Sequence, residues 1–186
     1  MARDGSEAPA PRGHARERLL AAAGELFYCG GINTTGVEAV AARAGVTKAT
    51  LYNHFASKDL LVVAYLRERL EASRAGLSAE PGEVSAASQR VAALFDAVVG
   101  DIQRGDFHGC PFAKAAVEVP GNAAAMEVVQ EHTEDVVRYL AVATGDGELA
   151  RTIAMLYDGA LIAAKVSGDA APVERARAAA VAMVTA

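Results

Sequence analysis

The stretch from Thr34 to Lys58 constrains the fold of this chain more than any other part of the sequence. It opens with apolar residues at the i, i+3, i+4, i+7 spacing of one helix face: Val37, Val40, Ala41 and Ala44. Gly45 follows directly and suits the left-handed conformation that ends many helices. Thr47 and Ser57 can each cap a further helix, so the stretch predicts two short helices, a glycine turn between them and the start of a third. This arrangement is a helix-turn-helix unit.

The same stretch predicts which sides of its helices are buried. Thr35 and Glu38 are spaced as a capping box, in which each side chain bonds the backbone N–H of the other. On the second short helix, Leu51 and Phe55 are four residues apart and are expected to point inward. The opposite side then combines cations, hydroxyl groups and small side chains: Lys48, Ala49, Thr50, Tyr52, Asn53 and His54. Such a side suits a recognition helix whose N-terminal end enters the major groove of DNA, although a helical hairpin with a solvated face is also consistent with these residues alone.

Residues 30–61 as a whole resemble the DNA-binding domain of the TetR family of transcriptional regulators. The resemblance rests on elements in the family's order and spacing: Thr34-Thr35, Ala44-Gly45-Val46, Thr47, Leu51-Tyr52-Asn53-His54-Phe55 and Ser57-Lys58-Asp59-Leu60-Leu61. One departure is Ala49, where many members have glycine, and its methyl group bears on which bases are read. A shorter stretch beginning Gly109-Cys110-Pro111-Phe112 is similar to the C-terminal domain of one branch of the family.

Composition and periodicity predict an all-α fold of about nine helices. The chain is 52% hydrophobic but only 5% aromatic, so its core is built largely from alanine and valine. The expected organisation is a disordered tail over residues 1–12, a helix-turn-helix DNA-binding domain over 13–58, and a ligand-binding and dimerisation domain over 59–186. A helix over residues 57–76 connects the two domains and is the candidate lever between them. Its opening, residues 60–66, is apolar on every side, which predicts burial all round.

The net charge of −5 is unusual for a DNA-binding protein, but it is unevenly distributed. Residues 1–58 hold seven basic and five acidic side chains, whereas the remainder holds eleven basic and eighteen acidic ones. Only the part that touches phosphate needs to be positive. The sequence has no apolar run long enough for a membrane span and no signal-peptide core, which predicts a cytoplasmic protein without a membrane partner.

These features lead to the hypothesis of a ligand-responsive transcriptional repressor that binds a palindromic operator in double-stranded DNA as a homodimer. Contacts to phosphate are expected from Thr34, Thr35, Lys48, Tyr52, His54 and Lys58. The residues expected to face the bases are Thr47, Ala49, Thr50 and Asn53. An activator is also compatible with the sequence. No catalytic residue, metal or cofactor is predicted, because the sequence shows no nucleophile paired with a base, no metal cage and no phosphate-binding glycine loop.

The resemblance implies a cavity in the C-terminal domain for a small-molecule inducer. Its candidate lining residues are Phe95, Phe107, Cys110, Phe112, Met126, His132, Tyr139, Met155 and Tyr157. Core packing is the ordinary alternative for each of them, and an all-α ligand-binding protein without DNA binding is the alternative for the whole chain. The last two helices are expected to form the dimer interface, because small residues keep their surfaces thin: Ala154, Gly159, Ala160, Ala163, Ala164, Ala176, Ala180 and Val184.

Cys110 suggests a second mechanism. His108 lies two residues before it and, when protonated, would lower the thiol pKa and create a sensor of oxidants or electrophiles. A small buried hydrophobe is the more ordinary role for a lone cysteine. Metal sensing through His108, Cys110 and His132 lacks a supporting ligand spacing.

Overall fold

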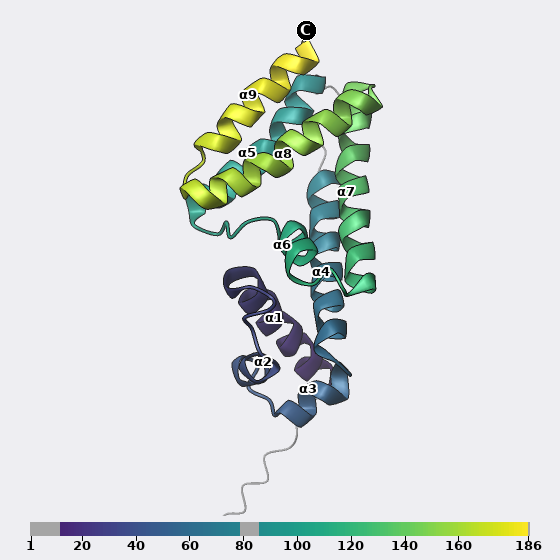
Figure 1. Cartoon of the computed structure of the whole chain (residues 1–186), viewed down its shortest axis with the longest axis vertical. Coiled ribbons are helices and arrows are strands. Elements are labelled where there is room, and N and C mark those ends of the chain that lie inside the picture. The colour runs from purple at the N-terminus through teal and green to yellow at the C-terminus, as the bar shows by residue number, and fades with distance from the viewer. Residues whose placement is uncertain (1–11, 79–85, 186) are drawn as a thin grey trace, which may run out of the picture. The chain divides into compact units, whose positions relative to one another are not determined.

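The computed structural model describes residues 12–78 and 86–185, and within these ranges the chain forms nine helices and no strand (Figure 1). The helices are α1 (Arg12–Gly30), α2 (Val37–Arg43), α3 (Lys48–His54), α4 (Lys58–Ser78), α5 (Ala87–Arg104), α6 (Pro111–Glu118), α7 (Ala123–Thr144), α8 (Gly147–Ser167) and α9 (Ala171–Thr185). This confirms the predicted all-α class. The chain divides into two compact units, and the division falls within α4, between Tyr65 and Leu66.

In the first unit, α1, α2, α3 and the start of α4 share a core of apolar side chains. Its fully buried members include Leu19, Phe27, Ile32, Val40, Leu51, Leu61 and Tyr65. The rings of Phe27 and Tyr65 meet edge to face with centroids 5.6 Å apart. Leu51 and Phe55 are both buried, so the predicted inward side of α3 is confirmed.

Local capping accounts for the boundaries of α3 and α4. Gly45 has a φ of +65°, as the predicted turn requires. The hydroxyl oxygen of Thr47 accepts a hydrogen bond from the backbone N–H of Thr50 at 3.1 Å. The hydroxyl oxygen of Ser57 accepts one from the N–H of Leu60, also at 3.1 Å. Both predicted caps are therefore confirmed, and each satisfies an N–H that the helix itself leaves unpaired.

The predicted capping box at Thr35 is wrong. The residue that precedes α2 is Gly36, and it makes no side-chain cap. The Thr35 side chain is buried instead, and its hydroxyl donates to the carbonyl oxygens of Gly31 at 2.7 Å and Leu26 at 3.3 Å. Thr35 thus ties the α1–α2 connection to the end of α1.

The prediction that residues 60–66 are buried all round is wrong on one side of α4. Leu61, Val62 and Leu66 are buried, whereas the Leu60 side chain is 52% exposed and Val63 is half-buried. The helix therefore has a buried side and a more exposed side, although every residue of this run is apolar.

In the second unit, α5, α7, α8 and α9 pack around one hydrophobic core. An apolar stripe of α5, with residues at helical spacing, faces this core: Val91, Leu94, Phe95, Val98, Val99 and Ile102. Phe95 and Tyr157 meet edge to face within it, with ring centroids 5.4 Å apart. The short helix α6 packs against α7, and α7 runs alongside the second half of α4 (Figure 1).

Two stretches of the chain fall largely outside the described residues. Of the predicted tail over residues 1–12, the structure describes Arg12 as the first residue of α1. Between α4 and α5, residues 79–85 lie outside the described ranges. None of the described helices is both long and apolar enough to cross a membrane.

Candidate functional site

Helix α3 presents a polar side on a scaffold that buries the opposite side. Burial of Leu51 fixes the rotation of this seven-residue helix about its own axis. Lys48, Ala49, Tyr52 and Asn53 are then exposed, as predicted, and Thr50 and His54 are half-exposed. A short helix with an exposed polar side at its N-terminal end has the form of a recognition helix.

The N-terminal end of α3 is ordered by its own hydroxyl groups. The hydroxyl oxygens of Thr47 and Thr50 lie 2.9 Å apart, in addition to the capping bond from the N–H of Thr50 to Thr47. One hydroxyl of the pair donates to the other, so one hydroxyl proton is left to donate to a phosphate or a base, and the remaining lone pairs can accept from a base. The two threonines are therefore held in place before any DNA binds.

Lys48 forms an ion pair that the sequence interpretation missed. Its Nζ lies 2.5 Å from Oε1 of Glu38 on α2 and 5.9 Å from the centroid of the Tyr52 ring. The hydrogen bond to Glu38 raises the pKa of Lys48, and the same bond lowers the pKa of Glu38. The sequence interpretation had assigned Glu38 to a capping box, and no helical periodicity relates residues ten apart across a turn.

Replacing Glu38 by glutamine should raise the affinity for DNA of any sequence about two- to fivefold, because Lys48 would no longer exchange a carboxylate for a phosphate. Fluorescence anisotropy with operator and random duplexes measures this change. Glu148→Gln is the matched control, since Glu148 forms a similarly exposed pair with Arg151 on α8 in the second unit. Equal or weaker binding by the Glu38 variant would contradict the expected competition.

The remaining predicted phosphate contacts lie in different settings. Thr34 is exposed, and its hydroxyl donates to the carbonyl oxygen of Gly30 at 2.6 Å. Lys58 is half-buried at the start of α4. Thr35 is a correction, because its buried hydroxyl is directed to carbonyl oxygens of α1 and its connection, where no phosphate can reach it.

The structure does not bring the candidate ligand residues together in one pocket. Phe95, Phe107, Tyr139 and Tyr157 belong to the main core of the second unit or pack against it. The Tyr139 hydroxyl donates to the carbonyl oxygen of Arg90 at 2.9 Å. Met155 is 69% exposed on α8 and lines a hollow with residues of α9, apart from the other candidates.

Phe112 of α6 and His132 of α7 form a separate contact. Their rings stack with centroids 3.8 Å apart and an interplanar angle of 11°, and Met126 is half-buried on α7. The hydroxyl of Ser73 on α4 lies 3.4 Å from Nδ1 of His132. Burial lowers the pKa of His132 to about 4, although the charge of Asp135 opposes this shift. His132 is therefore neutral at physiological pH.

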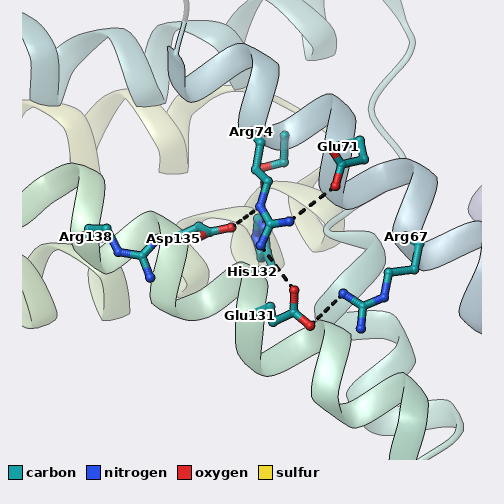
Figure 2. A network of polar contacts seen from close by, with 8 residues as sticks. Arg67, Glu71, Arg74, Glu131, His132, Asp135 and Arg138 are labelled. Carbon is teal, nitrogen blue, oxygen red and sulfur yellow. Dashed lines mark hydrogen bonds and ion pairs between the residues drawn. The ribbon is translucent and has the colours of Figure 1, made fainter.

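A network of arginines and carboxylates joins the second half of α4 to α7 around this histidine (Figure 2). Arg74 donates from Nε to Asp135 at 2.6 Å and from Nη2 to Glu131 at 3.1 Å. Arg67 donates to the other oxygen of Glu131 at 2.6 Å, and Arg138 donates to Asp135 at 2.6 Å. The three contacts from Arg67 and Arg74 hold the two helices in one register, whereas the Arg138 contact lies within α7. The sequence interpretation missed them, because the partners of Arg67 and Arg74 lie about sixty positions away.

The structure contradicts the predicted activation of Cys110 by His108. Burial raises the pKa of the Cys110 thiol, although hydrogen bonds from the backbone N–H groups of Ala113 and Phe112 oppose this shift. Cys110 precedes α6 as its cap, and its Sγ accepts from the N–H of Ala113 at 3.4 Å. Within the part of the chain that the structure describes, no group of three or more His, Cys, Asp or Glu residues could hold a metal ion.

The outer side of α8 and α9 differs from the predicted interface. The predicted small residues Ala154, Ala160, Ala164, Ala176 and Ala180 are buried in the core of their own unit. The exposed residues on the side shared with α9 are instead Met155, Gly159 and Ala163 on α8, with Ala179, Ala182 and Met183 on α9. On each helix they recur at three- and four-residue spacing, so they form a continuous apolar face.

Comparisons with known proteins agree with this architecture. The sequence model described as "Bacterial regulatory proteins, tetR family" matches residues 19–65. A TetR-family transcriptional regulator from Streptomyces coelicolor, whose crystal structure is known, is 34% identical. The match covers 92% of this chain and 88% of that one, with a TM-score of 0.82.

Two proteins of Mycolicibacterium smegmatis are also similar. The transcriptional activator FasR is 34% identical over 131 residues, which are 68% of this chain and 58% of FasR. The transcriptional repressor KstR2 is 38% identical over 71 residues, which are 38% of this chain and 33% of KstR2. The chain thus spans just over half of FasR and a third of KstR2. With its helix-turn-helix unit and its match to a solved member over most of both chains, the protein belongs to the TetR family of transcriptional regulators.

Proposed function

We propose that this DNA-binding regulator represses transcription by occupying a palindromic operator as a homodimer, and that a small-molecule inducer releases it. As a TetR-family regulator it is not an enzyme, and the proposal includes a cytoplasmic location, where its DNA target would be. The observation that carries the proposal is the exposed polar side of α3, with Lys48, Tyr52 and Asn53 outward and Leu51 buried. In this proposal Thr34, Lys48, Tyr52, His54 and Lys58 contact phosphates, and Thr47, Ala49, Thr50 and Asn53 face bases.

Dimerisation is supported by the apolar face of α8 and α9. Met155 of α8 is 69% exposed and Met183 of α9 is 42% exposed, and large exposed hydrophobic side chains in a continuous patch mark an interaction surface. A hollow of about 390 Å³ between α8 and α9, lined by Met155, Gly159 and Ala179 among others, can receive side chains of a second copy. In a dimer, the two helix-turn-helix units would bind half-sites ~34 Å apart and together make enough contacts for selective binding.

Repression is the simplest outcome, because it requires only that the operator be occupied. The two described units supply the parts needed for this, a DNA-reading helix and a dimerisation face. A reporter gene placed downstream of the operator tests the proposal. Expression of the protein should lower transcription from the reporter, and increased transcription would identify an activator instead.

Replacing Thr50 by valine should change the preferred base at one position of each half-site about five- to tenfold, because the variant keeps the shape of the side chain and loses its hydroxyl. Binding selection from a randomised duplex library measures this preference. Lys58→Ala is the contrasting variant. It should weaken binding to all sequences and reduce the steepness of the slope of log binding constant against log salt concentration by about one. A uniform loss for the Thr50 variant would contradict base readout.

The ligand response is proposed to act through α4, which passes from the first unit into the second. Contacts from Arg67 and Arg74 tie the second half of α4 to Glu131 and Asp135 of α7. A ligand that prefers one position of α4 would shift the population of operator-competent dimers. A coupling of ~1–3 kcal/mol changes operator affinity roughly 5- to 150-fold. The alternative sensor mechanism through Cys110 receives no support from the geometry, because burial raises its pKa.

A further inference from the structure

A groove of about 350 Å³ lies between α6 and α8 in the second unit. Its walls are mainly apolar, with Cys110, Ala113 and Val117 on the α6 side and Leu161, Ile162 and Val166 on the α8 side. The volume lies near the lower end of the ~300–1,000 Å³ that is usual for small-molecule sites. The space therefore suits a slender apolar molecule.

The groove keeps large apolar side chains in contact with water. Val117 is 81% exposed, Ile162 is 59% exposed and Val166 is 84% exposed. Exposing a cluster of such side chains to water around one hollow is unfavourable in free energy unless another molecule covers it. An apolar molecule in the groove would remove all three from water at once.

Lys165 supplies a positive charge at the edge of this apolar surface. It lines the groove, and within residues 12–78 and 86–185 no hydrogen bond or ion pair engages its ammonium group. Lys114 and Glu118 also line the groove, but each has an interaction partner already. The Cys110 thiol adds no charge, because burial raises its pKa. The groove thus combines apolar walls with one cation that is available to a ligand.

The loop before α6 passes close to the stem of Lys165. Gly109 has a φ of +97°, and a Cβ atom at this position would lie 3.7 Å from Cγ of Lys165. The gap between the loop and the lysine stem is therefore about the size of a methyl group, and the positive φ favours glycine at this point. Gly109 and the stem of Lys165 thus line the same part of the groove.

We infer that the groove between α6 and α8 binds an apolar molecule with one carboxylate, whose hydrocarbon part lies along Val117, Ile162 and Val166 and whose carboxylate pairs with Lys165. This inference rests on the proposed ligand response and names the chemical class of the inducer. A second copy of the chain is the less suitable occupant. The hollow that faces α9 lies on the other side of α8, where Ala160 and Ala163 line it, whereas Leu161 and Lys165 face α6.

Titration calorimetry with the full-length protein, in the absence of DNA, tests the inference with decanoate and decan-1-ol as probes. Lys165→Met keeps the apolar stem and removes the charge, so it should weaken decanoate binding about tenfold and leave decanol binding unchanged. Lys165→Arg should restore decanoate binding to within about threefold of the original. Arg151→Met is the matched control, because Arg151 is an exposed cation of α8 outside the groove. This variant should bind both probes with unchanged affinity.

A second variant tests the position of the site. Val117→Asp places a negative charge on the opposite wall of the groove. It should lower the affinity for both probes, and more for decanoate than for decanol, because decanoate carries the same charge. Lys165 and Val117 are both exposed, so their replacement leaves the core intact.

The inference is overturned by any of three results. They are the absence of decanoate binding at millimolar concentration, equal decanoate affinity in Lys165→Met, or a Val117→Asp protein that sediments as a monomer, which would assign the groove to the subunit interface. Because no DNA is present, a failure of these experiments leaves operator binding untouched, and a failure of operator binding leaves these experiments untouched.

Discussion

Replacing Met155 by glutamate should separate the dimer into monomers and lower operator affinity roughly 10²- to 10⁴-fold, the range by which a linked second binding event exceeds a single one. Met155 is 69% exposed and begins the apolar face of α8. In a two-fold dimer each copy would bring one new carboxylate into this face. Burying an unpaired carboxylate costs several kcal/mol, and the cost would be incurred twice in one interface.

Sedimentation velocity at micromolar concentration and a gel shift with operator DNA measure the two parts of this effect. Val142→Glu is the matched control, because Val142 is a similarly exposed apolar residue, at 71%, but lies on α7 outside the α8–α9 face. The control should remain dimeric and bind normally. A Met155→Glu protein that stays dimeric and binds the operator would show that this face is not the interface.

Lowering the pH from 7 to 4.5 should reduce the free energy of unfolding by about 2–3 kcal/mol through His132 alone. Burial against Phe112 lowers the pKa of this imidazole from 6.5 to about 4. Between these values the unfolded chain binds a proton that the folded chain does not. The free energy of unfolding therefore rises with pH through this window, and the stability that depends on neutral His132 is fully present above pH 6.5.

The variant His132→Leu should lose this part of the pH dependence, which urea denaturation at pH 7 and pH 4.5 measures. His14→Gln is the matched control, because His14 is exposed on α1. An unchanged difference between the two pH values in His132→Leu would contradict the assignment to His132.

Titration of nearby carboxylates changes the stability mainly in a more acidic pH range, or changes it equally in the original protein and in His132→Leu. The hydrogen bond from Arg67 lowers the pKa of Glu131. Burial alone would raise the pKa of Asp135, but bonds from Arg74 and Arg138 outweigh it and lower the pKa. Stability from both groups is therefore lost only below their ordinary pKa values, at more acidic pH. Burial raises the pKa of Asp158, which favours the folded state on acidification, but this effect is common to the two proteins.

Helix boundaries could be predicted because their causes lie within a few residues. Thr47 accepts from an N–H three residues on, and so does Asn122 at the start of α7. Such contacts depend on residue type and spacing alone. The exposed side of α3 could be predicted for the same reason, since burial of Leu51 and Phe55 leaves only one side for the polar residues.

The parts of the site that could not be predicted depend on residues far apart in the chain. Glu38 and Lys48 meet across a turn, and Arg74 meets Asp135 sixty-one positions later. For Thr35, a local contact was predicted where the structure has a tertiary one. Its hydroxyl does not cap α2 but donates to two carbonyl oxygens, one of the preceding helix and one of its connection to α2. Any local preference worth about 1 kcal/mol is overridden when tertiary packing offers a buried group a better partner.

The amino-acid sequence by itself determined that this chain is all-α, that α3 carries an exposed polar side, and that the family is TetR. Only the tertiary structure decided which small residues of α8 and α9 are buried and which form an outer face, and it alone brought Lys165 to an apolar groove beside α6. The physical reason is that alanine fits equally well inside a core and on a helix surface. Its periodicity therefore does not say which neighbour covers it, and that choice depends on how the helices pack.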